Sequence, residues 1–426
     1  MGGAPEANAA IRKGPWVQKV GPTSAIVRVE VDPPAAVTVE LQGATVGDAG
    51  NQRFESTAKT SLHAIEITGL SPSTRVTYTV RAGGEAKHAA ITTAPEDASG
   101  KPFRFLVYGD NRSDDAAHAA IVRAMVAAPS ELLVNTGDLV AEGANPQDWQ
   151  KFFDIEAPLL RERCLYSCIG NHELIDGAGI EFARYFGLQD VSGIGGDGGV
   201  GDGGARLTPE MLNGTFRWGS ARFFLLNGMV SMQGGATREW LEKALKTSDT
   251  EKDLVWRILV VHHGPWSGGP HGENKRLLDG GIIPLLKQHK VDLVLAGHDH
   301  IYERGMAEGG IPYLVSGGGG APTYKIKPTP ATKKFESVRH FVEASASTAA
   351  IQFVATRVDG TIIERCGLRK EPAGWDCDAP AVPPSPPPPT KCGCDVVGGD
   401  RNSYGLFVLP LVVAAIRRRW RSRPST

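Results

Sequence analysis

Residues 291–300 read VDLVLAGHDH, an apolar run of strand length that ends in a glycine and two histidines. Such a run predicts a buried strand with polar side chains just beyond its end. Four other apolar runs end in the same way, at residues 103–108, 132–135, 165–169 and 258–261. The motifs that follow them are Gly109-Asp110-Asn111-Arg112, Gly137-Asp138, Gly170-Asn171-His172-Glu173 and His262-His263. Because ligands gather beyond the carboxyl ends of strands that helices cover, the five motifs are predicted to meet on one rim of an α/β domain.

The residue types in these motifs indicate a metal site. Aspartate, asparagine and histidine without cysteine favour borderline to hard ions such as Zn, Mn or Fe. The motifs offer more ligands than one ion uses, and two ions that share a carboxylate form the clamp used for displacement at phosphorus. Asp138 is the candidate for the shared carboxylate. Taken alone, Gly137-Asp138 is equally well explained as a turn, so the ordered set of five motifs carries the prediction of a two-metal phosphoesterase.

The motif set resembles the calcineurin-like metallophosphoesterases and, within them, the purple acid phosphatase-like branch. Ile301-Tyr302-Glu303-Arg304, the region of Trp266 and the glycines at 317–320 add to this resemblance, which covers about residues 12–368. It implies a catalytic domain over residues 101–370, with two mixed sheets packed together and flanked by helices. Residues 116–128 and 238–246 are predicted helices of that domain.

The resemblance also implies the role of each motif residue. The two metal ions, drawn from Fe, Zn and Mn, would share Asp138. The first ion would be held by Asp110, Asp138 and His300, and the second by Asp138, Asn171, His262 and His298. His262 is preferred to His263 because similar sequences use the first histidine of the pair. His172 would lie outside both metals and face the leaving group.

Two positions depart from the family pattern, and both affect the first metal. Related acid phosphatases have a tyrosine where this chain has Ala141, and other branches have a histidine where it has Arg112. The first site therefore lacks one protein ligand. His118 either supplies that ligand or is a helix residue without a metal role. Arg112 either grips phosphate oxygens through two hydrogen bonds or pairs with a surface carboxylate.

These residues together predict hydrolysis of a small phosphoester. A water held between the two cations would lose its proton near neutral pH and attack phosphorus as a metal-bound hydroxide. Arg112 would neutralise the phosphoryl oxygens, and His172 would protonate the departing oxygen. The predicted activity is that of an acid phosphatase-like phosphomonoesterase. A phosphodiesterase or nucleotidase could use the same centre, and outside enzymes the alternative is a surface binding protein with a decayed site.

The first hundred residues follow a different pattern from the catalytic region. Short alternating runs predict a small antiparallel β-sandwich over residues 12–95. The segment around Tyr78 resembles the tyrosine corner of fibronectin type III domains, which precede the catalytic domain in this branch. The runs lie at residues 25–31, 37–41, 62–70, 76–82 and 89–93. Basic and acidic residues nearly balance, 46 against 47, and no long basic stretch occurs before the C-terminus, so nucleic-acid binding is not predicted.

The C-terminal segment suggests a location. A proline-rich linker at 379–391 leads to a tail at 392–426 that contains a Cys-Gly-Cys motif, an apolar run and an arginine cluster. The tail resembles the sorting signal of myxobacterial surface proteins, which implies export, cleavage near Cys392 and attachment at the cell surface or outer membrane. Residues 1–24 show no apolar region of a secretory signal. The glycine-rich residues 190–206 are predicted to form a loop over the active site.

Overall fold

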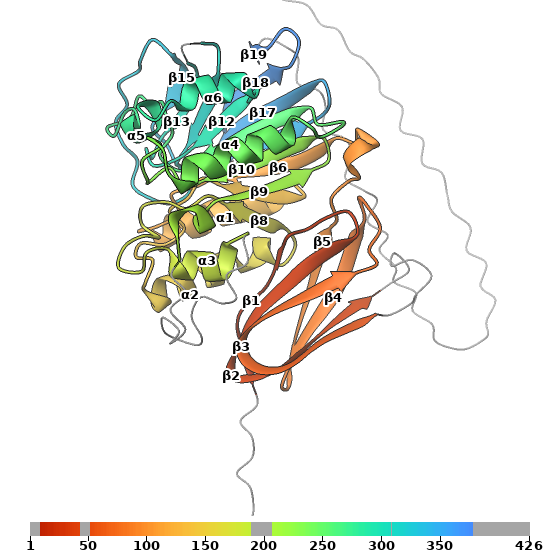
Figure 1. Cartoon of the computed structure of the whole chain (residues 1–426). Helices are drawn as coiled ribbons and strands as arrows, with labels where there is room; N and C mark the ends of the chain where they lie inside the picture. Colours follow the sequence, from red (N-terminus) through yellow and green to blue (C-terminus); the bar gives the residue numbers. More distant parts are fainter. Residues whose placement is uncertain (1–8, 43–51, 189–206, 308, 378–426) are drawn as a thin grey trace, which may run out of the picture. The chain divides into compact units, whose positions relative to one another are not determined.

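The computed structural model describes residues 9–42, 52–188, 207–307 and 309–377. The predicted glycine-rich loop, the linker and the C-terminal tail lie outside the described residues. Within the described residues the chain forms three β-sheets and the helices that cover two of them (Figure 1). None of the described helices is both long and apolar enough to cross a membrane.

The N-terminal sheet is antiparallel, as predicted, but its longest strand joins two of the predicted runs. The strands are β1 (Ala10–Gln18), β2 (Ser24–Gln42), β3 (Arg53–Thr68), β4 (Arg75–Ala82) and β5 (Glu85–Thr92). The first half of β2 pairs with β1 and its second half with β4, and the register shifts between Glu30 and Ala35. Pro33 and Pro34 lie in this interval, where proline cannot donate a ladder hydrogen bond. One bent strand therefore serves both halves of the sandwich.

The predicted tyrosine corner is not present at Tyr78. Its side chain is buried in the sandwich core, and the hydroxyl group has no hydrogen-bond partner among the described residues. A corner tyrosine would donate that hydrogen bond to the backbone. The all-β architecture is therefore confirmed, whereas this residue gives the fibronectin type III resemblance no support.

Two seven-stranded sheets form the described part of the catalytic region. The first has the order β19-β18-β17-β16-β6-β7-β8, and the second has the order β15-β13-β14-β12-β11-β10-β9. The first consists of β6 (Phe103–Tyr108), β7 (Leu132–Asn135), β8 (Cys164–Ser167), β16 (His340–Ala346), β17 (Ala350–Arg357), β18 (Ile362–Arg369) and β19 (Gly374–Asp376). The second consists of β9 (Gly214–Trp218), β10 (Ala221–Leu226), β11 (Trp256–Val261), β12 (Leu293–Ala296), β13 (Tyr302–Met306), β14 (Pro312–Ser316) and β15 (Thr332–Glu336).

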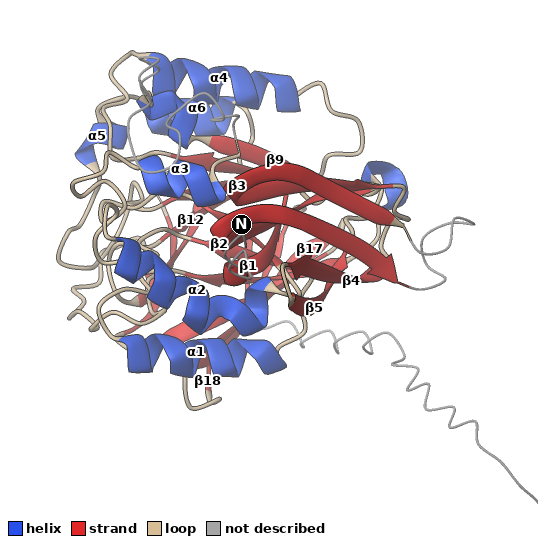
Figure 2. Ribbon diagram, turned by 90° about the horizontal axis from the view of Figure 1, so that it is seen from below, coloured by secondary structure: helices blue, strands red, loops and turns tan. Residues whose placement is uncertain are grey.

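Helices cover the outer face of each catalytic sheet, while the inner faces pack against each other. In Figure 2, α1 and α2 lie on one side of the strands, and α4 and α6 lie on the other. The inner layer includes Phe105, Phe223 and Ile258, which belong to one continuous apolar cluster. The helices are α1 (Asp115–Ala127), α2 (Pro146–Leu160), α3 (Ile180–Phe186), α4 (Ala236–Ser248), α5 (Lys275–Leu278) and α6 (Ile282–Gln288), with short 3-10 turns at Asp97–Ser99 and Pro209–Leu212. The predicted two-sheet α/β fold is confirmed.

Local sequence explains the two helices that stand beside the site. Asp114 caps α1 by accepting a hydrogen bond from the amide of Ala117 at 3.0 Å. Asn145 caps α2 in the same way, and Pro146 occupies its first turn. Trp149, Phe152 and Phe153 lie on the buried face of α2 and form part of the apolar cluster beneath it, as their spacing predicts.

The described cysteines divide into one disulfide and two free thiols. Cys366 and Cys377 form the disulfide that the turn-rich segment between them allows. Cys164 and Cys168 are free and buried, as their positions along one extended strand indicate.

A buried histidine in the catalytic domain should make stability depend on pH. His340 on β16 is fully buried, and burial lowers its pKa to about 4. Unfolded histidine titrates near pH ~6.5, so the unfolded chain gains the proton first as the pH falls. Stability is then lost between about pH 6.5 and pH 4, by about 3 kcal/mol from this group. Denaturant unfolding at pH 7 and pH 4.5 should show a smaller loss in His340→Asn than in the unsubstituted protein, and an equal loss would contradict the expectation.

Candidate metal centre

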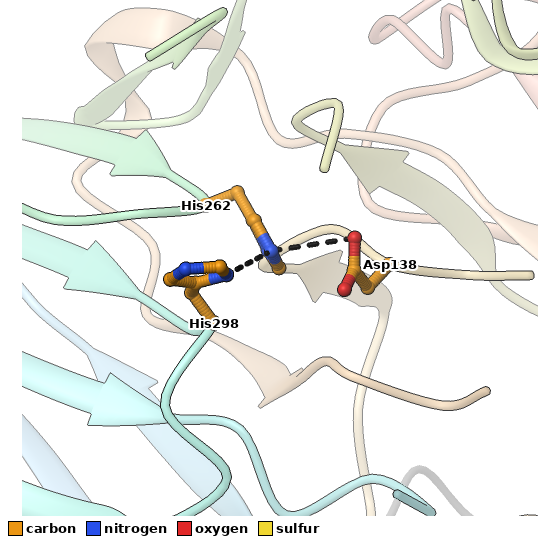
Figure 3. Close-up of side chains that lie close together, drawn as sticks. All are labelled: Asp138, His262 and His298. Atoms are coloured by element: carbon orange, nitrogen blue, oxygen red, sulfur yellow. Dashed lines mark hydrogen bonds and ion pairs between the residues drawn. The ribbon is translucent and has the colours of Figure 1, made fainter. Parts of the chain in front are cut away.

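The predicted ligands follow the carboxyl ends of strands in both catalytic sheets. Strands β6, β7 and β8 run parallel in the first sheet, as β10, β11, β12 and β14 do in the second. Because the two sheets pack face to face, the loop after β7 meets the loops after β11 and β12. His262 Nε2 lies 3.3 Å from Asp138 Oδ1 and closes this junction (Figure 3). The rim is therefore shared by two sheets.

Three of the candidate ligands sit in a backbone conformation that ordinary residues seldom adopt. Asp110, Asp138 and His298 have φ values of 58°, 57° and 68°. Hydrogen bonds between the loops hold this conformation, because the amide of Asp110 donates to the carbonyl of Gly137 at 2.9 Å. The amide of His298 donates to Asp110 Oδ2 at 3.0 Å. Strained residues held by their surroundings concentrate at functional sites.

Close packing in this region also explains a glycine of the third motif. A Cβ atom built at Gly170 would lie 2.1 Å from Asp138 Oδ1, which is closer than any real contact. Only glycine therefore lets the Asn171 loop approach the Asp138 carboxylate.

The four predicted ligands of the second metal come together. His262 Nε2 lies 3.1 Å from Asn171 Oδ1 and 3.1 Å from His298 Nδ1. His262 Nδ1 donates to the carbonyl of Thr136 at 2.8 Å, so Nε2 is the nitrogen that faces the site. One ligand atom each from Asp138, His262 and His298 lie within 4.8 Å of one another. This donor set fits Zn, Mn or Fe.

The electrostatics of this group differ from residue to residue and favour a positive charge beside Asp138. Burial opposes a charged imidazole, yet the charge and hydrogen bond of Asp138 raise the pKa of His262 to about 9. Burial also opposes the Asp138 carboxylate, but His262, His172 and Arg112 hold the pKa of that carboxyl below its usual value. Burial and the neighbouring histidines lower the pKa of His298 to about 2. A positive charge is therefore favoured beside the Asp138 carboxylate, while His298 stays neutral and can offer a lone pair.

The predicted ligands of the first metal lie beside this group. Asp110 Oδ1 is 3.5 Å from His300 Nε2 and is buried without a hydrogen-bond partner. Such an unpaired buried oxygen fits a cation ligand. His300 Nδ1 donates to the carbonyl of Pro322 at 2.6 Å, so its Nε2 carries the free lone pair.

Arg112 points into the same region and pairs with a buried carboxylate of the site. Its Nε donates to Asp138 Oδ2 at 2.9 Å, and its Nη2 lies 3.3 Å from His300 Nε2. The bond to Asp138 raises the pKa of the guanidinium although burial opposes it. The alternative of a pair with a surface carboxylate is therefore wrong, because Asp138 is fully buried.

His118 is held in a polar network behind the site. Its Nε2 lies 2.8 Å from Glu156 Oε1 and 3.0 Å from Asn111 Nδ2. Glu156 also accepts a hydrogen bond from Tyr108. These buried partners occupy the nitrogen that a metal would need, so the structure favours His118 as a helix residue without a metal role.

His172 takes a position that suits proton transfer. Its Nδ1 donates to the carbonyl of Ala141 at 2.6 Å, and its Nε2 lies 3.9 Å from Asp138 Oδ2. The backbone of Ala141, whose side chain departs from the family pattern, thus orients this ring. The His172 side chain remains 21% exposed, so Nε2 can meet a substrate.

Glu173 is a positioning residue to which the sequence motif assigned no role. It is fully buried, and its carboxylate accepts hydrogen bonds from the amides of Asp138, Val140 and Gly170 at 3.0, 3.2 and 2.8 Å. Burial and nearby Asp138 raise the pKa of Glu173 to about 7. The available signal in the sequence was the position of Glu173, a charged residue that ends the motif after a buried strand.

Two more side chains at the rim, Tyr324 and His271, were missed because they come from other loops. The Tyr324 ring stacks on His300 with a centroid distance of 4.0 Å. The His271 ring lies 4.1 Å from the His298 ring, and its Nδ1 contacts Asp299 Oδ1 at 2.8 Å. The His263 ring lies 4.5 Å from the His298 ring, but its Nε2 contacts the carbonyl of Gly272, whereas His262 Nε2 faces Asp138.

Comparisons with known proteins agree with this geometry. Residues 103–302 match the calcineurin-like phosphoesterase family, and residues 8–97 match a domain of unknown function, DUF7800. Purple acid phosphatase 7 of Arabidopsis thaliana is 26% identical over 200 residues, which cover 40% of this chain and 61% of the relative. An uncharacterized protein of Mycobacterium tuberculosis is 27% identical over 294 residues, covering 59% of this chain and 52% of the relative. The chain thus spans between about half and three fifths of these relatives.

Solved structures show the same fold at low sequence identity. A purple acid phosphatase from yellow lupin seeds, PPD1, superimposes with a TM-score of 0.66 at 15% identity, over 84% of this chain and 74% of that one. PhoD superimposes with a TM-score of 0.64 at 13% identity, over 88% and 92%. With the family match, the two-sheet fold and the assembled ligands, residues 103–302 form a calcineurin-like metallophosphoesterase domain with purple acid phosphatases among its relatives.

Proposed function

We propose that this chain is a metal-dependent phosphoric ester hydrolase that acts on small phosphomonoesters in the manner of an acid phosphatase. The observation that carries the proposal is the junction at Asp138. Its carboxylate lies close to both His262 and His298, accepts a hydrogen bond from Arg112, and has its Oδ2 3.9 Å from His172 Nε2. The family relatives support a phosphoester hydrolase.

The residues present suit a centre of two metal ions from among Fe, Zn and Mn. Asp110, Asp138 and His300 would hold the first ion, and Asp138, Asn171, His262 and His298 would hold the second. When bound, the ions supply Lewis acidity and a water of lowered pKa. Asn171 contributes a neutral oxygen, so the site keeps enough positive charge to attract phosphate.

The chain's own side chains would complete the reaction. Arg112 supplies a permanent positive charge and several N–H donors near the phosphoryl oxygens. His172 Nε2 faces outward because Nδ1 is held by Ala141, so it can give a proton to the leaving oxygen. The buried walls around Asp138 exclude bulk water and strengthen these interactions.

Metal reconstitution tests the proposal. The protein is stripped with a chelator, reloaded with Mn, Zn or Fe, and assayed with p-nitrophenyl phosphate, bis-p-nitrophenyl phosphate and nucleotides. We expect hydrolysis of p-nitrophenyl phosphate only after reloading. Faster turnover of the diester would indicate a phosphodiesterase instead of a monoesterase, and faster turnover of nucleotides would indicate a nucleotidase. If no metal gave hydrolysis of any substrate, the proposal would fail, and the alternative of a binding protein with a decayed site would be favoured.

His172→Ala should lower kcat about 10²- to 10³-fold on alkyl phosphates, because their leaving oxygens need a proton. The loss should be much smaller on p-nitrophenyl phosphate, whose leaving group departs readily as an anion. Steady-state kinetics on both substrates measure the difference, and the matched control is His88→Ala, which changes an exposed histidine of β5. Equal losses on the two substrates would argue against a proton donor.

The proposal extends to the place of action. The tail at residues 392–426 supports export and attachment at the cell surface, where a phosphatase would release phosphate from external esters. Protease shaving of intact cells tests this location, since a surface protein is digested while cytoplasmic markers survive.

A further inference from the structure

Arg112 contacts two of the atoms that a first metal would need. Its Nε lies 2.9 Å from Asp138 Oδ2, and its Nη2 lies 3.3 Å from His300 Nε2. Since Arg112 offers only N–H donors, both partners use lone pairs to accept its hydrogen bonds. A metal ion at this position would bind through the same lone pairs.

The surrounding contacts limit which atoms of His300 and Asp138 could bind a first metal. His300 Nδ1 is committed to the carbonyl of Pro322, so Nε2 is the nitrogen that could bind an ion. Asp138 Oδ1 already accepts the amide of His172 and lies against His262, which leaves Oδ2 for the first site. Arg112 and a first metal therefore require the same two atoms.

The second site shares only Asp138 with Arg112, and it would use Oδ1, which faces His262, whereas Arg112 contacts Oδ2. Among the described residues, Arg112 makes no hydrogen bond with Asn171, His262 or His298, and these three meet at His262 Nε2. At the first site, Asp110 Oδ1 is buried and unpaired, so a cation still gains a ligand by entering. It must, however, displace a guanidinium that stays charged and whose side chain is only 13% exposed.

We propose that Arg112 is a built-in competitor for the first metal, so that the centre fills in a fixed order. The second site binds an ion at low free metal. The first site fills at higher free metal, when the ion displaces the guanidinium from Asp138 and His300. This inference rests on the ligand assignment of the proposed function, but not on the reaction.

Metal titration tests the order directly. Metal-free protein is dialysed against increasing free Mn²⁺, bound metal is counted per chain, and electron paramagnetic resonance distinguishes single from coupled Mn²⁺ ions. We expect one equivalent to bind before the other, with coupling only after the second. Arg112→Met keeps the length of the side chain but removes its charge and donors. It should tighten the second equivalent by about tenfold or more, since like charges this close repel strongly.

Further variants assign each equivalent to its site. His262→Ala should remove the tight equivalent, whereas His300→Ala should remove the weak one. Arg112→Lys keeps a charge but cannot bridge two acceptors, so its second equivalent should bind with intermediate affinity. Arg123→Ala removes an exposed arginine of α1 and should leave both affinities unchanged. Thermal melting of each metal-free variant confirms that it folds.

Two results would overturn the inference. One is uptake of two Mn²⁺ ions with indistinguishable affinity by the unsubstituted protein. The other is an unchanged second affinity in folded Arg112→Met. Either result can occur in a protein that hydrolyses phosphoesters. Conversely, ordered binding that Arg112→Met abolishes would support the inference even if no phosphoester were hydrolysed, so the two proposals fail separately.

Discussion

Asp138→Asn is expected to lower kcat/KM for p-nitrophenyl phosphate by about three orders of magnitude or more, because catalysis of this kind depends above all on stabilising charge at the reacting centre. The substitution keeps the volume of a fully buried side chain and removes only its charge and one acceptor oxygen. Arg112 and His262 both contact this carboxylate, and both proposed metal sites would depend on its charge. Steady-state kinetics after reconstitution with Mn or Zn, with bound metal counted in the same samples, measures the loss.

Asp154→Asn is a matched control, because Asp154 is an exposed residue of α2. It should leave both activity and metal content unchanged. Activity of Asp138→Asn within about tenfold of the unsubstituted enzyme, a difference of only ~1.4 kcal/mol in activation free energy, would show that Asp138 is not the shared ligand.

Glu173→Gln is expected to lower the free energy of unfolding by about 3 kcal/mol, because the buried carboxylate accepts three backbone hydrogen bonds. Glutamine offers one acceptor oxygen and an NH₂ group that cannot accept, so at least one amide among Asp138, Val140 and Gly170 loses its partner. Denaturant unfolding of the metal-free protein at pH 8, where the carboxyl group is mainly ionised, measures this loss.

The same substitution should weaken metal binding, since Glu173 holds the loop of Asp138 against the loop of Asn171. The exposed Glu66→Gln on β3 controls for the change of net charge. If Glu173→Gln unfolded at the same denaturant concentration as Glu66→Gln, Glu173 would have no positioning role.

Much of the fold could be predicted because its local signals agree with one another. Each of the five apolar runs became a strand, and α1 and α4 lie within a few residues of the predicted helices. Burial on both faces makes such strands almost wholly apolar, so the polar residues that end them stand out. One difference from the prediction has a local cause. Two predicted runs belong to the single strand β2, which bends at Pro33 and Pro34 and pairs with different strands on either side.

The candidate site was predictable in composition but not in contacts. Arg112 had two possible partners in the sequence, and only the packing shows it on Asp138 and His300. His118 had the residue type of a ligand, yet α2 brings Glu156 to its ring nitrogen. Tyr324 and His271 lie in loops without a strand-end signal, so only their ring contacts with His300 and His298 place them at the rim.

The sequence by itself determined which side chains end the strands and which chemistry they offer, because strand period and ligand type are local properties. The tertiary structure alone decided which atoms meet. Thr136 and His262 are 126 residues apart and follow strands of different sheets, yet a hydrogen bond of 2.8 Å joins them beside Asp138. Contacts of this kind depend on how two sheets pack, and that packing is set by the whole apolar layer between them. For that reason the contacts of Arg112 with Asp138 and His300 can be seen in the structure and not in the motif.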